Sequence, residues 1–198
     1  MQAVERLDVH LVYNTPHEMP LEAELQELAR AELPRGRRLF VERVERSHSK
    51  AENLNHAIPK ITAQYVAIYD ADHQPDPSSL ALAVSQLKVS GVDCVQGSTY
   101  IRAGCCLARG LVQAEFFVVY FVMLPAMEVI AGTGFFGGSN GVWRASSLSC
   151  LRFDEKALTE DIDCFARATL DHGFTFGFLP ESCSGELLPS TLPAFWRQ

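Results

Sequence analysis

The sequence predicts one α/β domain with a largely parallel β-sheet, and three observations lead to this fold class. Short apolar or alternating stretches are interleaved with stretches that carry apolar residues at helical spacing, which is the pattern of strand–helix–strand units. The length of 198 residues is enough for a substantial core. A hydrophobic content of 47% is that of a folded domain. No repeat or low-complexity linker divides the chain, so residues 1–198 are expected to form a single domain.

The first unit is strand, helix, strand. LDVHLVY, Leu7–Tyr13, has the apolar content of a strand, and a turn at Asn14 follows it. Leu21–Leu33 carries leucines at helical spacing with charged residues between them, and Pro34 ends that pattern. Arg38–Glu45 then alternates as a second strand.

The second unit begins at a capping-box spacing. Ser49 stands three residues before Glu52, which predicts a helix that ends near Pro59. Tyr65–Tyr69 is short and apolar, as a buried strand is. The stretch SLALAVSQLKVS predicts a helix capped by Gly91, and VDCVQGSTYI predicts the next strand.

The most apolar stretch is FFVVYFVMLPAMEVIAG, Phe116–Gly132. Its apolar part is short, because Glu115 and Glu128 bracket it and Pro125 breaks it, whereas a membrane-spanning helix needs about 20 apolar residues. We therefore expect a buried or interfacial helix here, and no spanning helix in the chain.

The charge of the chain limits its partners. The net charge is -7, and lysines and arginines form no run. This composition argues against a nucleic-acid partner. A negatively charged ligand would therefore need a local cation or a bound metal ion.

Two carboxylates end the predicted strand in YVAIYDADHQPDP. In a strand, alternate residues point to the same side, so Asp70 and Asp72 could direct both carboxylates to one point. The carboxyl ends of strands are where α/β sheets bind ligands, and carboxylate oxygens suit Mg²⁺ or Mn²⁺. Taken alone, such a pair is more often an ordinary polar strand end.

Four stretches resemble, in order, motifs of the family 2 glycosyltransferases with the GT-A (Rossmann-like) fold, above all the branch of cellulose, chitin and hyaluronan synthases. These stretches are SKAENLNHAI, YDADHQPDP, FFGGSNGVWRASSL and LTEDIDCFARATLDHGF. The resemblance implies a sheet flanked by helices and a metal-dependent, inverting transfer. In that reaction a sugar passes from a UDP-sugar to a hydroxyl of a glycan acceptor and forms a β-linkage.

The resemblance also implies roles for individual residues. Asp161 would be the general base, with Glu160 beside it in the T-E-D motif. The residues themselves add that Thr159 is a plausible N-cap, which puts both carboxylates in a first helical turn, where the helix dipole favours them. The remaining assignments are Asp70 and Asp72 for the metal, Lys50, Asn14 and Asp70 for the nucleotide, and Gly137, Gly138, Asn140 and Gln198 for the acceptor.

Several residues keep an alternative. Lys50 could meet phosphate or be a solvated lysine, and Trp143 could stack on a sugar, although a core position is commoner for tryptophan. His73, next to the carboxylate pair, could be a third metal ligand. Glu160 and Asp161 could do no more than complement the helix dipole.

The chain departs from the family at both ends. Only one strand–helix–strand unit precedes Lys50, so we expect the family's first strand to be missing. A second alignment puts Leu7–Thr15 on that first strand, and the strand that ends in the family's acidic D-D-x motif is then missing instead. In the first alignment the uridine-contacting carboxylate is replaced near Asn14. Gln198 resembles the first residue of the family's Q-x-x-R-W motif.

These departures predict a partial catalytic domain. In a full-length parent it would be membrane-associated on the cytoplasmic side, while this chain alone would be soluble. The alternative is a truncated, non-catalytic nucleotide-binding or interaction module.

Overall fold

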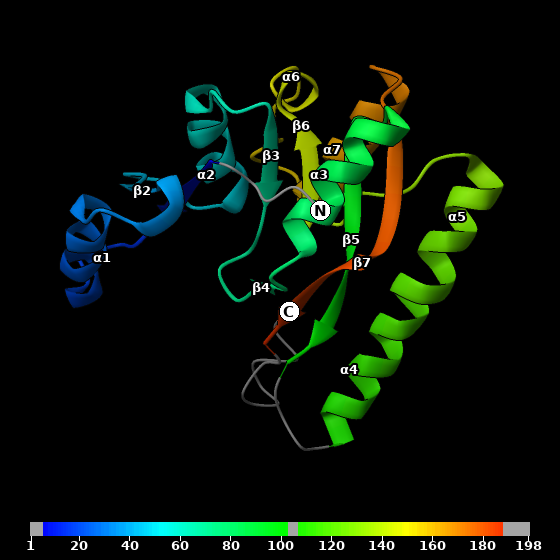
Figure 1. Ribbon diagram of the computed structural model, residues 1–198, viewed down its shortest axis with the longest axis horizontal. Helices are drawn as coiled ribbons and strands as arrows, with labels where there is room; N and C mark the ends of the chain where they lie inside the picture. The colour runs from blue at the N-terminus through cyan, green and yellow to red at the C-terminus, as the bar shows by residue number, and fades with distance from the viewer. Residues whose placement is uncertain (1–5, 103–106, 188–198) are drawn as a thin grey trace.

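In the computed structural model, which describes residues 6–102 and 107–187, the strands form two separate sheets (Figure 1). In the smaller sheet, β1 (Leu7–Tyr13) pairs in parallel with β2 (Arg37–Arg43). The helix α1 (Pro20–Arg30) and the 3₁₀ turn η1 (Pro34–Gly36) connect these two strands. The predicted strand–helix–strand unit is therefore confirmed.

The larger sheet has the strand order β3-β6-β5-β7-β4. Its strands are β3 (Tyr65–Ile68), β4 (Gln74–Pro75), β5 (Cys94–Ile101), β6 (Gly141–Arg144) and β7 (Phe176–Glu186). β5 and β7 are parallel, whereas β6 is antiparallel to both β3 and β5. The prediction of a mostly parallel sheet is therefore wrong, because the chain turns back before β6 and inserts this strand between two that run the same way.

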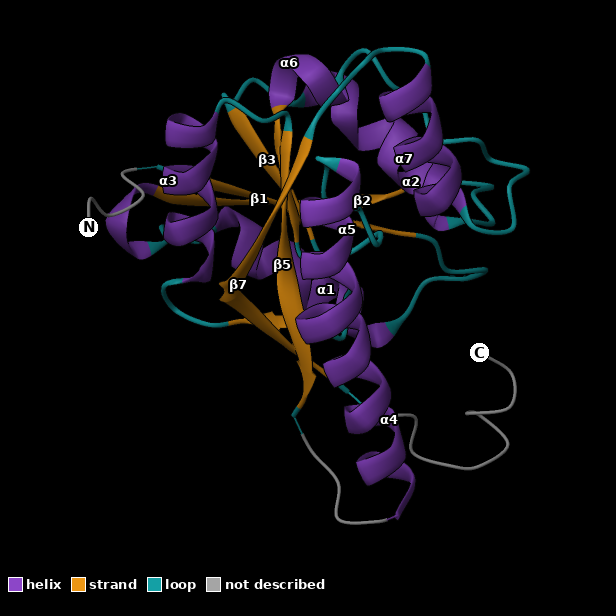
Figure 2. Ribbon diagram, turned by 90° about the vertical axis from the view of Figure 1, so that its right-hand side faces the viewer, coloured by secondary structure: helices purple, strands orange, loops and turns teal. Residues whose placement is uncertain are grey.

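Helices cover both faces of the larger sheet (Figure 2). On one face α3 (Ser79–Ser90) packs its buried Ala83 and Leu87 against β5 and β6. On the other face lie α2 (Lys50–Ala57), which continues into the 3₁₀ turn η2 (Ile58–Lys60), and α7 (Glu160–Leu170). The short α6 (Ala145–Leu148) follows β6. The result is a three-layer arrangement with one core on each face of the sheet.

The core beneath α7 is aromatic. Trp143 is completely buried, and its ring lies edge-to-face on Phe136 and Phe176, with centroids 5.0 and 5.3 Å apart. Such pairs add to the stability that burial itself supplies. Trp143 is thus a core residue, and no sugar can stack on it in this arrangement.

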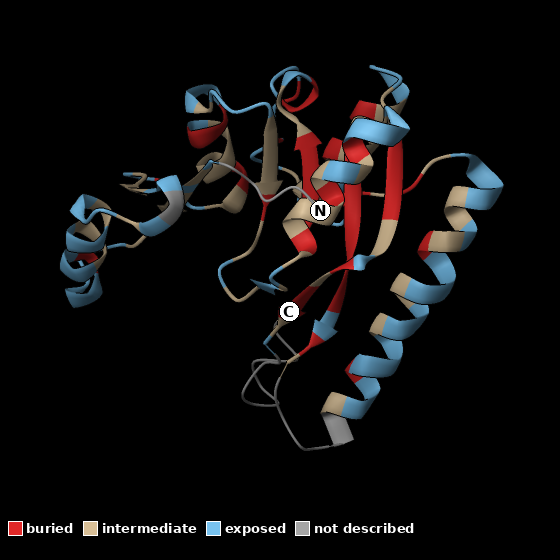
Figure 3. Ribbon diagram, viewed as in Figure 1, coloured by how far each residue is buried: buried red, intermediate tan, exposed pale blue. Residues whose placement is uncertain are grey.

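A long helix lies on the outside of the domain, where the sequence analysis expects a buried or interfacial helix. The helix α4 (Leu107–Val118), the π-helical turn η3 (Val119–Met123) and α5 (Leu124–Ala131) follow one another without a break. Pro125 does not end this helix: it lies directly after the π-helical turn η3, and local π-helical geometry can re-satisfy backbone groups that a proline leaves without a partner. Among the described residues, Arg109–Ala131 is long and apolar enough to cross a membrane, and only 6% of its most apolar stretch is buried (Figure 3).

Candidate active site

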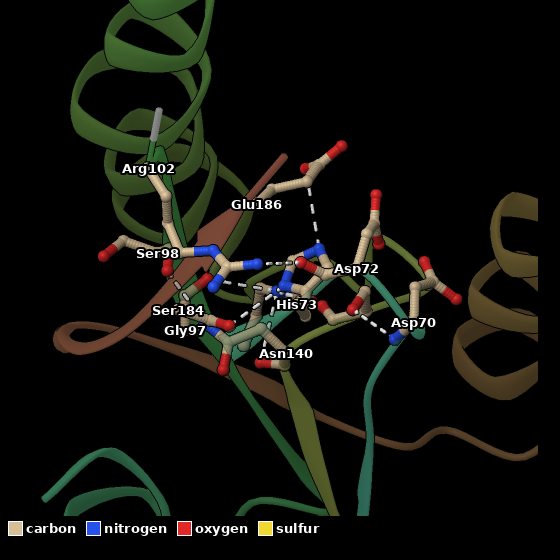
Figure 4. Close-up of polar contacts among 12 residues, drawn as sticks. Asp70, Asp72, His73, Gly97, Ser98, Arg102, Asn140, Ser184 and Glu186 are labelled. Atoms are coloured by element: carbon tan, nitrogen blue, oxygen red, sulfur yellow. Dashed lines mark hydrogen bonds and ion pairs between the residues drawn. The ribbon is translucent and has the colours of Figure 1, made fainter. Parts of the chain in front are cut away.

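The two predicted metal carboxylates lie in a turn and not in a strand. β3 ends at Ile68, and the backbone N–H of His73 donates to the carbonyl of Asp70 at 3.0 Å, which closes a four-residue turn over Asp70–His73 (Figure 4). The alternation of side chains along a strand therefore does not apply to this pair. The backbone N–H of Asp70 donates to the hydroxyl of Ser139 at 3.0 Å, which ties the turn to the segment before β6.

Lys50 connects the carboxylate turn with the glycine pair. Ser49 caps α2 by accepting the backbone N–H of Glu52 at 3.2 Å, as the capping-box spacing predicts. Lys50 is the first residue of this helix. Its ammonium group forms an ion pair with the carboxylate of Asp70 and donates to the carbonyl oxygen of Gly138 at 2.9 Å. The structure therefore places Lys50 at the predicted site.

Asp161 lies directly against Gly138. Thr159 stands at the N-cap of α7, so Glu160 and Asp161 occupy its first turn, as predicted. Gly138 has a φ of +80°, and a Cβ atom built on it would lie 2.7 Å from Oδ2 of Asp161. A residue without a side chain is required here both for the backbone angle and for the approach of the carboxylate.

These contacts bring together the residues predicted to bind the nucleotide and the residue predicted to be the general base. Asp70 pairs with Lys50, Lys50 bonds Gly138, and Gly138 contacts Asp161. The four residues come from the turn after β3, the start of α2, the segment before β6 and the start of α7. A carboxylate predicted to bind metal, a cation and a candidate base therefore lie at one place on the carboxyl side of β3.

Gly137 borders a small apolar cavity. Its backbone N–H donates to the side-chain carbonyl of the buried Gln96 at 3.0 Å. The cavity is about 120 Å³ and lies between this segment and the long outer helix, where Tyr120 and Phe135 line it. A larger cavity of about 350 Å³ is lined by Arg152 and its neighbours, with no predicted site residue in its wall.

Asn140 occupies a different place from the one predicted. Its side chain is completely buried, and its amide nitrogen donates to the carbonyls of Ser98 and Ser182 at 2.8 and 2.9 Å. The amide thus joins β5 to β7 and is shielded from solvent. The position of Asn140 corrects the prediction that it lines the acceptor surface.

Asn14 is held by the loop before α2. Its amide nitrogen donates to the carbonyl of Ser47 at 3.1 Å, and its side-chain oxygen accepts from Asn53 at 3.1 Å. These bonds place the end of β1 against the start of α2, so Asn14 lies beside the site, where its role toward a nucleotide stays a prediction. Gln198 lies outside the described residues.

Three residues that the sequence reasoning did not assign also shape the site. Ser139 accepts from Asp70 as described above, Arg102 donates to the carbonyl of Asp72 at 3.0 Å, and Asn55 exchanges two bonds of 2.9 Å with the backbone of Phe153, ahead of α7. Ser139 lies within the predicted glycine motif. Arg102 follows β5 directly, and only its place after a strand could have drawn attention to it.

The donor set fits a hard divalent cation. Asp70 and Asp72 supply carboxylate oxygens on a single turn, and within the described residues no group of three or more histidine, cysteine or acidic side chains gathers into a metal site. Mg²⁺ and Mn²⁺ are commonly held by one or two carboxylates, with substrate phosphates and water as the other ligands. The residues present therefore suit a metal that binds together with a phosphorylated substrate.

Two plant proteins are similar in sequence to this chain. The chain is 30% identical over 147 residues to glucomannan 4-beta-mannosyltransferase 1 of Oryza sativa subsp. japonica, which covers 73% of this chain and 28% of that protein. It is 32% identical over 152 residues to glucomannan 4-beta-mannosyltransferase 7 of Arabidopsis thaliana, covering 74% and 27%. The chain thus matches about a quarter of the length of these relatives.

Solved structures share the fold. A mannosyltransferase from Pyrobaculum calidifontis in complex with GDP-Man and Mn²⁺ superposes with a TM-score of 0.64 at 23% identity, over 97% of this chain and 59% of that one. TarS 1–349 of S. aureus in complex with UDP-GlcNAc gives 0.60 at 11% identity, over 96% and 60%. The GT-A fold is thereby confirmed. The family model described as "Glycosyltransferase like family 2" matches residues 2–198, and the chain therefore belongs to the family 2 glycosyltransferases.

Proposed function

We propose that this chain is the catalytic part of an inverting, metal-dependent glycosyltransferase that moves a hexose from a nucleoside diphosphate sugar to a hydroxyl of a glycan acceptor, forming a β-linkage. The observation that carries the proposal is the contact of Asp161 with Gly138, whose carbonyl is bonded by the same Lys50 that pairs with Asp70. A base and a diphosphate site must lie this close for a direct displacement.

In this mechanism Asp161 accepts the proton of the acceptor hydroxyl as that oxygen attacks the anomeric carbon. A positioned base of this kind contributes about 10²–10⁴-fold to the rate. A hydrogen bond of 2.8 Å from the backbone N–H of Ile162 to Oδ1 of Asp161 holds the carboxylate, and Oδ2 is the oxygen on the side of Gly138. One displacement at the anomeric carbon inverts it, so an α-linked donor gives a β-linked product.

Asp70 and Asp72 would hold the metal, which when bound neutralises the charge that develops on the leaving diphosphate. Lys50 adds a cation at the N-terminus of α2, where backbone N–H groups also favour an anion. The ammonium group also pairs with Asp70 and so holds that carboxylate beside the start of α2.

The donor is the part of the proposal on which the observations divide. The family resemblance implies a UDP-sugar, whereas the relatives named above are mannosyltransferases and one similar structure holds GDP-Man. Both donors present the same diphosphate to Lys50 and the metal. The two donors differ in their nucleobase, so UDP and GDP should be compared in one binding experiment.

Calorimetry of UDP and GDP binding with and without Mn²⁺ tests the nucleotide site. We expect Mn²⁺-dependent binding by the chain and none by Asp72→Ala. A matched variant, Asp154→Ala, removes an exposed carboxylate elsewhere and should bind like the unaltered chain. Equal binding by Asp72→Ala and the unaltered chain, or binding by neither, would refute the metal site. Turnover of UDP-glucose, UDP-GlcNAc and GDP-mannose then identifies the sugar, and Asp161→Asn should bind nucleotide without turnover.

A non-catalytic nucleotide-binding or interaction module is the second candidate. It is favoured by Asn14, which stands where the resemblance implies a nucleotide-contacting carboxylate and whose side chain is already bonded to Ser47 and Asn53. Metal-dependent nucleotide binding without turnover of any donor by the unaltered chain would support this candidate over the enzyme.

We infer, in addition, that the protein works at a membrane surface, as expected for a full-length parent with its catalytic domain on the cytoplasmic side. The support is the outer helix, on which Phe117 and Phe121 stack at 5.5 Å and are 59% and 48% exposed. Exposed apolar patches mark surfaces that interact with membranes or with other proteins, and a lipid surface is the partner proposed here. Vesicle flotation should lose the chain when both residues become aspartate, whereas Val89→Asp, an exposed apolar residue of α3, should float as before. Flotation unchanged by the double substitution would refute the inference.

A further inference from the structure

His73 is buried beside the carboxylate turn, with both ring nitrogens directed at β7. Its side chain is only 4% exposed. Nδ1 lies 3.0 Å from the hydroxyl of Ser184, and Nε2 lies 3.5 Å from a carboxylate oxygen of Glu186 (Figure 4). A histidine that serves as a metal ligand needs one nitrogen free for the metal. The contacts with β7 therefore give His73 a different task from the third-ligand alternative.

The backbone of Asp72, which precedes His73, is also held by hydrogen bonds. Arg102 donates from Nη2 to the carbonyl oxygen of Asp72 at 3.0 Å, and its guanidinium also bonds the side chain of Gln74. The backbone N–H of Arg102 donates to the carbonyl of Glu186 at 2.9 Å. The carbonyl of Asp72 is therefore anchored to Arg102 at the end of β5, and the next residue, His73, is anchored to β7.

We propose that His73 and Arg102 are positioning residues for the carboxylate of Asp72, so that the ends of β5 and β7 set where that carboxylate stands. The proposal rests on the function proposed above. A turn residue has two backbone torsions, and anchoring its own carbonyl through Arg102 and the next residue through His73 restricts both, which fixes the direction in which the side chain of Asp72 leaves the backbone. Groups that orient a metal ligand in this way are typically worth about 10–100-fold in metal affinity.

Mn²⁺ affinity of the whole chain, followed by the electron paramagnetic resonance signal of free Mn²⁺ at one fixed pH, tests the proposal. The titration is run with UDP and, in a parallel series, with GDP. We expect His73→Ala to bind Mn²⁺ about 10–100-fold more weakly. His73→Asn keeps a polar amide group where Nδ1 stands, so it should recover most of the affinity. His172→Ala, which removes an exposed histidine at the end of α7, is the matched control and should bind like the unaltered chain.

Each result has one reading. Affinity of His73→Ala equal to that of the unaltered chain overturns the proposal, and so does an equal loss in His73→Ala and His73→Asn, because the bond to Ser184 would then not matter. If His73→Ala does not fold, Ser184→Ala takes its place, with a several-fold loss expected and an unchanged affinity overturning the proposal. If Asp72→Ala loses Mn²⁺ binding but the His73 variants do not, only this inference fails. If Asp72→Ala binds Mn²⁺ like the unaltered chain, the proposed function fails as well.

Discussion

Replacing Gly138 by alanine tests the contact on which the proposed base depends. Gly138 has a φ of +80°, and the added Cβ would lie 2.7, 3.0 and 3.2 Å from Oδ2, Cβ and Cγ of Asp161. Alanine in the left-handed region costs about 1–2 kcal/mol. Overpacking a filled site costs about 1–3 kcal/mol more, since Asp161 has to turn or α7 has to move.

The sum is about 2–5 kcal/mol, which for a chain of this size lowers the midpoint of thermal unfolding by about 4–20 °C. Gly91 provides the control, because it has a φ of +75° and its added Cβ would meet no described atom within 4 Å. Gly91→Ala should therefore show the backbone cost alone. The difference between the two variants measures the contact with Asp161.

Differential scanning calorimetry of both variants, each with Asp161 present and with Asp161→Ala, completes the test. The excess cost of Gly138→Ala should shrink when Asp161 is alanine, because two of the three close atoms are then gone. In the sugar-transfer assay Gly138→Ala should lose up to about 10²–10⁴-fold, the contribution of a general base. Equal destabilisation by the two glycine variants, or an excess that persists without the Asp161 carboxylate, would refute the proposed contact.

Three further expectations concern charges and thiols. Lys50→Met should weaken Mn²⁺-dependent nucleotide binding while changing the free energy of unfolding by less than about 1 kcal/mol, because its ion pair is partly exposed; unchanged calorimetric affinity would contradict this. Hydrogen bonds from Lys60 hold the pKa of Glu42 below its ordinary value of 4.5. A carboxylate with a lowered pKa stabilises the fold at pH values above its unfolded pKa and loses that effect as the pH falls. Lys60→Met should therefore cost at most about 1 kcal/mol at pH 7 and less at pH 3 in urea denaturation; an equal cost at both pH values would count against the pair. Burial raises the pKa of the Cys164 thiol to about 12, whereas Cys150 is exposed. Iodoacetamide at pH 8 should therefore modify Cys150 and spare Cys164 in peptide mapping, and equal modification of both would disagree with the packing of α7.

Local patterns predicted the elements well. The strand over Leu7–Tyr13 has the predicted bounds, Ser49 caps its helix, and Gly91 ends α3 in the left-handed conformation. Each of these features depends on residues within a few positions of one another. The strand β6 could not be placed in the same way, because its neighbours in the sheet are determined by pairing between distant segments.

The candidate site shows the same difference between local patterns and long-range contacts. The motifs identified Asp70, Lys50 and Asp161, but the contact that joins Lys50 to Gly138 spans 88 residues of sequence. The bond from His73 to Ser184 spans 111 residues. No spacing rule covers contacts of this length, so the sequence predicts which residues take part and the fold shows how they hold one another.

The separation of the two sheets has a consequence for the dynamics of the domain. A two-stranded sheet is marginally stable by itself, so β1 and β2 depend on α1 and on the Asn14 contacts with Ser47 and Asn53. Amide protons of β1 and β2 should therefore exchange with solvent faster than those of the central β5, as expected for a unit that opens before the rest. Because Asn53 lies on the helix that Lys50 begins, each opening of that unit would also loosen the cation that faces the carboxylate turn.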